Sequence, residues 1–135
     1  MTAGYSKRPL SQKLGLKPGF KVIILNPPPG YEATLGPLPA DVTVATDLTG
    51  PLDFIHFFTK ERTELETEFP TLKQALAMTG MLWISWPKGA SKVPTDLDGN
   101  IVREIGLAHG LVDVKVAAVD EVWSGLKFMV RVKDR

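Results

Sequence analysis

Three short, largely apolar runs decide which folds this chain can adopt. Residues 21–26 (KVIILN) hold four consecutive aliphatic side chains and are followed by Pro27-Pro-Pro-Gly30. Residues 52–58 (LDFIHFF) and 81–86 (MLWISW) are rich in aromatic and β-branched side chains. Such runs are typical of strands that are buried on both faces, as strands are in a parallel sheet. The chain is therefore expected to form a mostly parallel β-sheet.

The segments between these runs predict the remaining elements. One helical turn is expected within residues 31–39, and another strand at residues 42–46. A helix is expected to begin at residue 60 with Thr59 as its N-cap, or one turn later at the capping-box pair Thr63 and Glu66. Pro70 would kink or split this helix, and Gly80 would end it. A second helix is expected at residues 97–109, before two final strands at residues 112–119 and 126–132.

This order of elements predicts a small α/β domain of Rossmann-like type. It would have three layers, a mostly parallel sheet and a C-terminal antiparallel hairpin. The length of 135 residues suits a single domain. Residues 1–135 are therefore interpreted as one domain, with residues 1–12 as a flexible N-terminal segment.

The composition argues against several classes of protein. The chain has no cysteine, which excludes disulfides and thiol catalysis, and two histidines are too few for a typical zinc site. Sixteen Lys and Arg residues against fifteen Asp and Glu residues leave a net charge of +1, which does not favour nucleic-acid binding. No signal peptide or membrane-spanning stretch is evident. A cytoplasmic protein without a membrane partner is expected.

Ligands of open parallel sheets bind beyond the carboxyl ends of the strands. Residues 88–92 offer two ammonium groups, a hydroxyl and a flexible backbone for a phosphate or carboxylate, although a solvated loop is the alternative. Asp47 follows Asn26 at nearly the spacing of a ribose-binding acid, although a turn cap is the alternative. The candidate ligand-binding residues are Asn26, Gly30, Tyr31, Asp47, Thr59, Lys60, Lys88, Gly89, Ser91 and Lys92.

No catalytic residue and no metal ligand is nominated. His56 lies within an apolar strand and is interpreted as a hydrogen-bonded core residue, whereas His109 suits a helix C-terminus. Residues 96–100 (DLDGN) resemble the start of a calcium loop. The glycine and glutamate that such a loop needs are replaced by Ile101 and Leu107, so a helix N-terminus is expected instead.

Two family resemblances add to this interpretation. Residues 53–88, with a strand, a helix, a Thr-Gly pair and an apolar strand, resemble the second half of a class I methyltransferase, and the final hairpin resembles its antiparallel end. The first half departs from that family, because the turn Asn26-Pro-Pro-Pro-Gly-Tyr31 lacks the G-x-G pattern. Nearly the whole chain resembles the bacterial domain-of-unknown-function family numbered 3052, which implies no activity. That resemblance is carried by residues 14–19, 82–88, 105–110, 111–116 and 120–127.

The leading functional hypothesis is a non-catalytic small-ligand-binding or regulatory module without a cofactor. It follows from the missing catalytic motifs and from the basic loop at residues 88–92. The expected partner is an anionic small molecule, such as a nucleotide, or a protein. One alternative is a methyltransferase-related enzyme that uses Asn26-Pro-Pro as an active-site turn and binds S-adenosylmethionine (SAM). The other is a protein-interaction module that forms a homodimer through the terminal hairpin.

Overall fold

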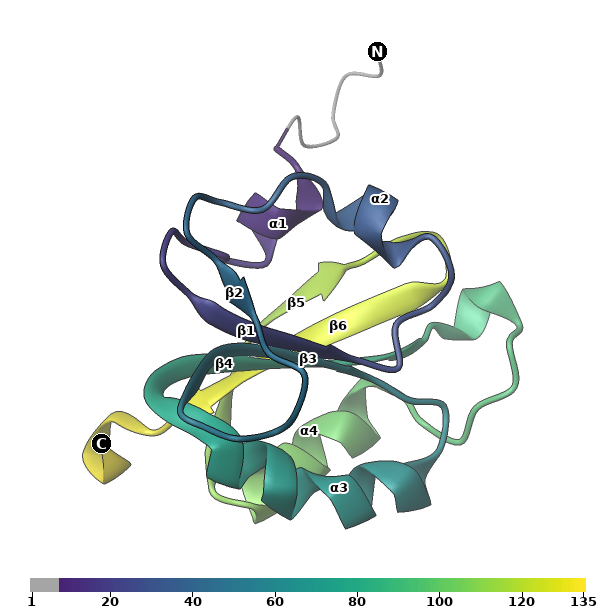
Figure 1. Cartoon of the computed structure of the whole chain (residues 1–135). Coiled ribbons are helices and arrows are strands. Elements are labelled where there is room, and N and C mark those ends of the chain that lie inside the picture. Colours follow the sequence, from purple (N-terminus) through teal and green to yellow (C-terminus); the bar gives the residue numbers. More distant parts are fainter. Residues whose placement is uncertain (1–7) are drawn as a thin grey trace.

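The computed structural model describes residues 8–135, and Figure 1 shows the arrangement of their helices and strands. Each predicted apolar run forms a strand, and helical segments connect these strands on both sides of the sheet. Two short 3₁₀ helices, η1 and η2, complete the chain. The elements are α1 (Leu10–Lys13), β1 (Lys21–Leu25), α2 (Tyr31–Leu35), β2 (Thr43–Val44), β3 (Leu52–Phe58), α3 (Arg62–Ala75), β4 (Leu76–Pro87), η1 (Gly89–Ser91), α4 (Gly99–Ala108), β5 (Leu111–Ala118), β6 (Trp123–Val130) and η2 (Val132–Asp134).

The strands form one six-stranded sheet in the order β2-β1-β3-β4-β6-β5. The first four strands of this order are parallel, whereas β6 pairs antiparallel with both β4 and β5. Helices α1 and α2 lie on one face of the sheet, and α3 and α4 lie on the other (Figure 1). The expected fold class, a three-layer Rossmann-like domain with an antiparallel C-terminal end, is confirmed.

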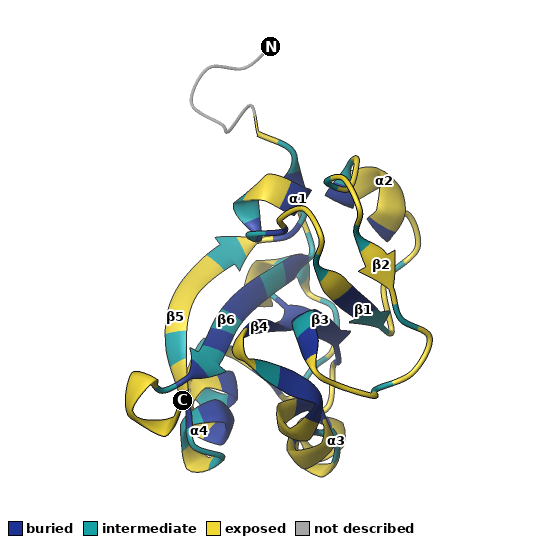
Figure 2. Ribbon diagram, turned by 60° about the vertical axis from the view of Figure 1, so that its left-hand side comes forward, coloured by how far each residue is buried: buried dark blue, intermediate teal, exposed yellow. Residues whose placement is uncertain are grey.

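The sheet separates the buried side chains into two clusters. Ile55 and Phe57 belong to the cluster beneath α3 and α4, whereas Phe54 and Phe58 belong to the cluster beneath α1 and α2. This alternation follows from the two-residue period of a strand. Figure 2 shows that the central strands are buried and that β2 and β5, at the two edges, are more exposed. Because both faces of β3 are buried, apolar residues fill most of its positions in both alternating sets.

Helix α3 differs from its prediction at both ends. It begins at Arg62, one turn of chain beyond Thr59, and continues through Pro70 without splitting. It ends at Ala75, and β4 starts at the next residue. Gly80 therefore lies inside β4, where a Cβ atom would come within 2.7 Å of the Leu52 carbonyl oxygen. The glycine permits a close approach of two strands and does not cap the helix.

The N-terminal half is also less regular than its pattern suggests. Strand β2 has two residues, in contrast to the five that were expected, and residues 10–13 form helix α1. Leu10 and Ser11 are buried, and residues 1–7 of the predicted flexible segment lie outside the described residues. Trp83 ties α1 to the sheet, because its Nε1 donates a hydrogen bond of 2.9 Å to the Leu14 carbonyl oxygen. Within residues 8–135, no helix has the length and apolar character needed to cross a membrane.

Candidate functional site

The turn after β1 sets the geometry of the candidate site. Asn26 has a φ of 56°, in the left-handed region that asparagine tolerates better than most residues. Its side-chain amide donates a 3.3 Å hydrogen bond to the Phe58 carbonyl oxygen, which joins the ends of β1 and β3. Three prolines follow, and Gly30, with a φ of 81°, precedes α2. The turn thus directs α2 back over the same face of β1.

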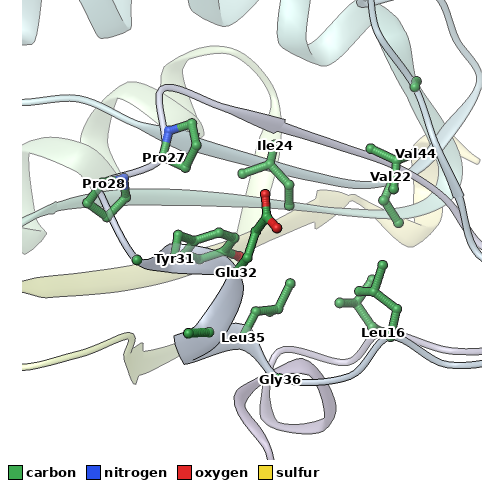
Figure 3. Close-up of a pocket in the computed structure, with 14 residues that line it drawn as sticks. Leu16, Val22, Ile24, Pro27, Pro28, Tyr31, Glu32, Leu35, Gly36 and Val44 are labelled. Atoms are coloured by element: carbon green, nitrogen blue, oxygen red, sulfur yellow. The ribbon is translucent and has the colours of Figure 1, made fainter.

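A cleft of about 860 Å³ lies between α2 and the strands β1 and β2 (Figure 3); we call it the β1–α2 cleft. Its volume lies within the range typical of small-molecule sites. Among the described residues that line it, Glu32 is the only charged one. The cleft is thus apolar with a single carboxylate. It is lined by Leu16, Val22, Ile24, Pro27, Pro28, Gly30, Tyr31, Glu32, Ala33, Leu35, Gly36, Leu38, Val44 and Ala45.

A second cleft of about 500 Å³, here the strand-end cleft, lies at the carboxyl ends of β1 and β3. The Thr59 hydroxyl donates to the Glu64 carboxylate and accepts a 3.1 Å hydrogen bond from the Glu61 backbone N–H. Pro27 and Pro28 line both clefts, so the two spaces meet at the turn after β1. The strand-end cleft is lined by Asn26, Pro27, Pro28, Pro29, Phe58, Thr59, Lys60, Glu61, Glu64, Val93, Val122 and Trp123.

A buried chain of polar side chains supports the wall of the β1–α2 cleft. The Tyr31 hydroxyl lies 2.7 Å from His56 Nδ1, and His56 Nε2 lies 2.7 Å from Ser85 Oγ. Burial lowers the pKa of His56 to about 3 and raises the pKa of Tyr31, so both are uncharged at neutral pH. His56 also stacks on Phe58, with ring centroids 4.1 Å apart. The interpretation of His56 as a hydrogen-bonded core residue is confirmed, and its role is to hold Tyr31 in place.

The structure divides the ten predicted site residues into groups. Gly30 and Tyr31 line the β1–α2 cleft, whereas Asn26, Thr59 and Lys60 line the strand-end cleft. The other five residues, which line neither cleft, are Asp47, Lys88, Gly89, Ser91 and Lys92. The Ser91 hydroxyl donates a 2.6 Å hydrogen bond to the Lys88 carbonyl oxygen and so stabilises the turn around η1. Ligand binding by these residues stays a prediction.

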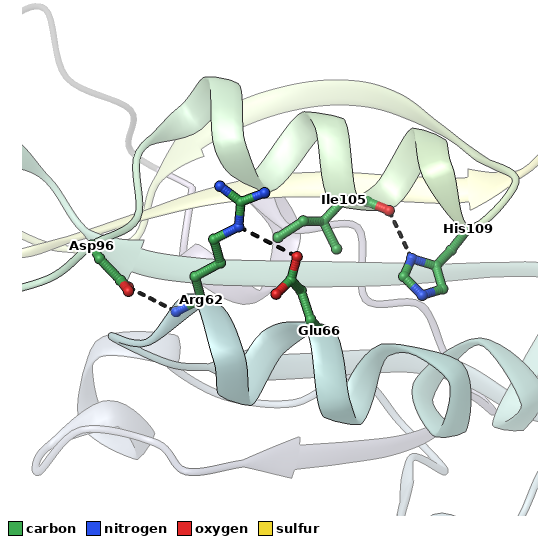
Figure 4. Close-up of polar contacts among 5 residues, drawn as sticks. All are labelled: Arg62, Glu66, Asp96, Ile105 and His109. Carbon is green, nitrogen blue, oxygen red and sulfur yellow. Dashed lines mark hydrogen bonds and ion pairs between the residues drawn. The ribbon is translucent and has the colours of Figure 1, made fainter.

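The other polar residues singled out in the sequence have structural roles. Asp98 caps α4 by accepting a 2.8 Å hydrogen bond from the Ile101 N–H. Figure 4 shows Asp96 accepting from the Arg62 N–H at 2.7 Å, and His109 Nδ1 bonded to the Ile105 carbonyl oxygen at 2.8 Å. These contacts fix both ends of α4. Within residues 8–135, no group of three or more His, Cys, Asp or Glu side chains is arranged to hold a metal ion.

No family model matches the chain, and no curated protein matches it. Solved structures do match it. A SAM-dependent methyltransferase from Aquifex aeolicus aligns with a TM-score of 0.62 and 16% identity over 89% of this chain and 87% of that one. The DhpI–SAH complex aligns with a TM-score of 0.63 and 13% identity over 92% and 83%. Magnesium protoporphyrin IX methyltransferase from Synechocystis PCC 6803 with bound SAM aligns with a TM-score of 0.62 and 14% identity over 90% and 74%. The chain has the methyltransferase-like form of the Rossmann-like fold.

These comparisons contradict two expectations. The prediction of a non-catalytic binding module and the prediction of no cofactor are both contradicted, because the similar structures include a SAM-dependent methyltransferase and proteins solved with SAM or SAH bound. The methyltransferase-related alternative fits the comparisons better. The prediction of a non-catalytic module followed from the missing catalytic motifs and from the basic loop at residues 88–92. The order of the strands depends on contacts between distant residues, which local sequence patterns do not show.

Proposed function

We propose that the protein is a methyltransferase-related enzyme that binds SAM in the β1–α2 cleft and a methyl acceptor in the strand-end cleft. One observation carries this proposal: two clefts meet at Pro27 and Pro28, at the carboxyl end of β1 in a sheet of methyltransferase-like fold. Ligand and acceptor would then lie on either side of one turn. The proposal includes membership in the bacterial family numbered 3052, which the sequence resembles over nearly its whole length.

The lining of the β1–α2 cleft fits the adenosine part of SAM. Ile24, Val44 and the prolines offer the apolar walls that a purine ring requires. Tyr31 is held by its contact with His56, so this wall is organised before a ligand enters. Glu32 extends from α2 into the cleft (Figure 3), where its carboxylate can accept hydrogen bonds from hydroxyl groups.

The strand-end cleft offers groups for the acceptor. SAM, when bound, supplies an electrophilic methyl group on a sulfonium sulfur. Glu61 and Glu64 place two carboxylates at this cleft, and a carboxylate can take the proton that a methylated amine or hydroxyl loses. Phe58 and Trp123 are buried aromatic residues that exclude water from its inner side. The Lys60 ammonium offers a contact for a negatively charged part of the acceptor.

The direct test is calorimetric titration of the full chain with SAM and with SAH. A matched pair of variants locates the site. Val44 is 55% exposed on one edge strand and lines the cleft, whereas Val116 is 64% exposed on the opposite edge strand. We expect Val44→Arg to weaken binding by at least about tenfold, because a charged side chain would occupy the apolar wall. Val116→Arg is expected to bind like the original protein. Absence of binding by both ligands, or equal effects of the two variants, would contradict the proposal.

A further inference from the structure

Four lysines gather where helix α1 meets the two C-terminal strands, and we call Lys13, Lys17, Lys115 and Lys127 the lysine cluster. Lys115 and Lys127 are direct cross-strand partners in β5 and β6. Lys115 Nζ lies 3.5 Å from the carbonyl oxygen of Lys13, the last residue of α1. Figure 2 shows α1 above one end of β5, whose surface is largely exposed. None of the four lysines lines either cleft.

The ammonium groups of the lysine cluster repel one another. Like charges directly opposite on neighbouring strands destabilise a sheet. Burial lowers the pKa of Lys127, and the nearby charges of Lys115 and Lys17 lower it further. Among the described residues, no carboxylate forms an ion pair with any of the four lysines. The fold thus concentrates positive charge that its own described side chains do not neutralise.

Trp83 fixes the position of one member of the lysine cluster. The Lys127 ammonium lies 5.9 Å from the centroid of the Trp83 ring, within the range of a cation–π attraction. The same ring donates the 2.9 Å hydrogen bond to Leu14 that ties α1 to the sheet. Trp83 is 0% exposed, so both contacts are made on a rigid part of the core. The positive charges are therefore organised before a partner arrives.

A chain of phosphates fits this arrangement better than a membrane surface does. Lys17 and Lys115 are exposed, whereas Lys13 and Lys127 are half-buried, so the cations lie at different depths. A flexible chain of phosphates can follow such differences, but a planar bilayer meets only the outermost groups. The exposed large apolar side chains of residues 8–135 include no aromatic ring on which a base could stack. Contacts would therefore be made with phosphates and not with bases.

We infer that the lysine cluster binds the sugar–phosphate backbone of a nucleic acid without reading its base sequence. The net charge of +1 is a sum over the whole chain, and it does not exclude a local concentration of lysines. The inference is independent of the proposed function, because the lysine cluster lies outside both clefts.

The test is fluorescence anisotropy of a labelled oligouridine titrated with the full chain at several salt concentrations. Contacts with three or four phosphates of a single strand predict that log K falls by about 2 to 3 for each unit of log salt concentration. Replacing both Lys115 and Lys127 by glutamine should remove about half of this slope and weaken binding at low salt by at least about tenfold. The matched control replaces Lys88 and Lys92 by glutamine. It removes the same charge from the loop around η1 and should bind like the original protein.

Lys115→Gln alone keeps the contact between Lys127 and Trp83. It should leave the Tm unchanged or raise it, because cross-strand repulsion is relieved, while removing about a quarter of the salt slope. This variant assigns the loss of binding to the lysine cluster even if the double variant is less stable.

Several results would overturn the inference. One is the absence of oligouridine binding at low salt, including the case in which phosphatidylserine vesicles bind in its place. Another is equal weakening by the two double variants, because binding would then follow the overall charge. A third is equally tight binding of an oligoglutamate of the same charge, which would indicate an acidic protein partner. A salt slope that is unchanged by loss of Lys115 and Lys127 would exclude these side chains as the phosphate contacts.

Discussion

Tyr31→Phe removes a single hydroxyl group from the buried chain that supports the candidate site. The Tyr31 hydroxyl and His56 Nδ1 are 2.7 Å apart, and the other imidazole nitrogen, Nε2, is hydrogen-bonded to Ser85 Oγ. A neutral imidazole has one donor and one acceptor nitrogen. In either tautomer the substitution leaves Nδ1 without its partner, at a residue whose exposure is 0%. Water therefore has no route to replace the lost hydroxyl.

The expected magnitude follows from this burial. Leaving a buried polar group unpaired costs about 1–3 kcal/mol of unfolding free energy. The aromatic ring at position 31 is retained, since phenylalanine keeps the edge contacts that the Tyr31 ring makes with His56 and Phe58. No cavity term of the kind that accompanies large-to-small changes is therefore added. For a domain of this size each kcal/mol corresponds to a change in Tm of about 3–5 °C.

Urea denaturation followed by circular dichroism measures this change, and a double-mutant cycle assigns it to the pair. Tyr31→Phe and His56→Phe are combined, and the double variant should lose about 1–2 kcal/mol less than the sum of the two single losses. The reason is that the second substitution removes the nitrogen that the first one leaves unpaired. A loss below about 0.3 kcal/mol for Tyr31→Phe, or simple additivity in the cycle, would refute the account of the buried chain.

Two further predictions concern stability. The pKa of His56 is lowered in the folded state to about 3, below its unfolded value, so its stabilising effect is complete above about pH 6.5 and is lost as the pH falls towards 3. In urea titrations between pH 7 and pH 4, the original protein should lose up to about 1.4 kcal/mol per pH unit more than His56→Phe, and parallel curves would contradict this. Gly106→Ala should lower the unfolding free energy by about 1–3 kcal/mol, because its Cβ would lie 2.1 Å from the buried Phe128 ring. Gly99→Ala in the same helix is the control, since its Cβ would lie 3.5 Å from Trp86; equal stability of the two variants would contradict the packing argument.

The sequence predicts the central strands well for a physical reason. Strand β3 has the predicted bounds, Leu52–Phe58, because a strand buried on both faces is mostly apolar and its single buried polar residue, His56, is hydrogen-bonded. The start of β4 was missed, since Leu72, Ala75 and Leu76 continue a helical spacing. Leu76 is drawn into the sheet by pairing with Leu52, which lies 24 residues earlier in the chain. The local spacing of apolar residues does not predict such a contact between distant positions.

The candidate site was predicted only in part, for the same reason. Asn26, Gly30 and Tyr31 could be nominated because strand ends carry ligands, and the structure places them at the two clefts. Glu32 was missed. Its only sequence signal is an acidic residue in the first turn of a very short helix. Its place in the cleft depends on the contact of Tyr31 with His56, which joins residues 25 positions apart.

The short helix between β1 and β2 explains why a cleft exists here. Helix α2 has five residues and ends at Leu35, with Gly36 as its C-cap, so it covers only part of the adjacent sheet face. Leu38 and Val44 remain 42% and 55% exposed at the rim of the cleft. A longer helix would bury this surface and gain about 25 cal/mol for each Å² of apolar area removed from water. This apolar surface instead stays uncovered near the carboxyl end of β1, where Rossmann-like sheets bind ligands. Under the proposed function the adenosine part of SAM would fill this cleft, whose described lining residues are apolar apart from the Glu32 carboxylate and the Tyr31 hydroxyl.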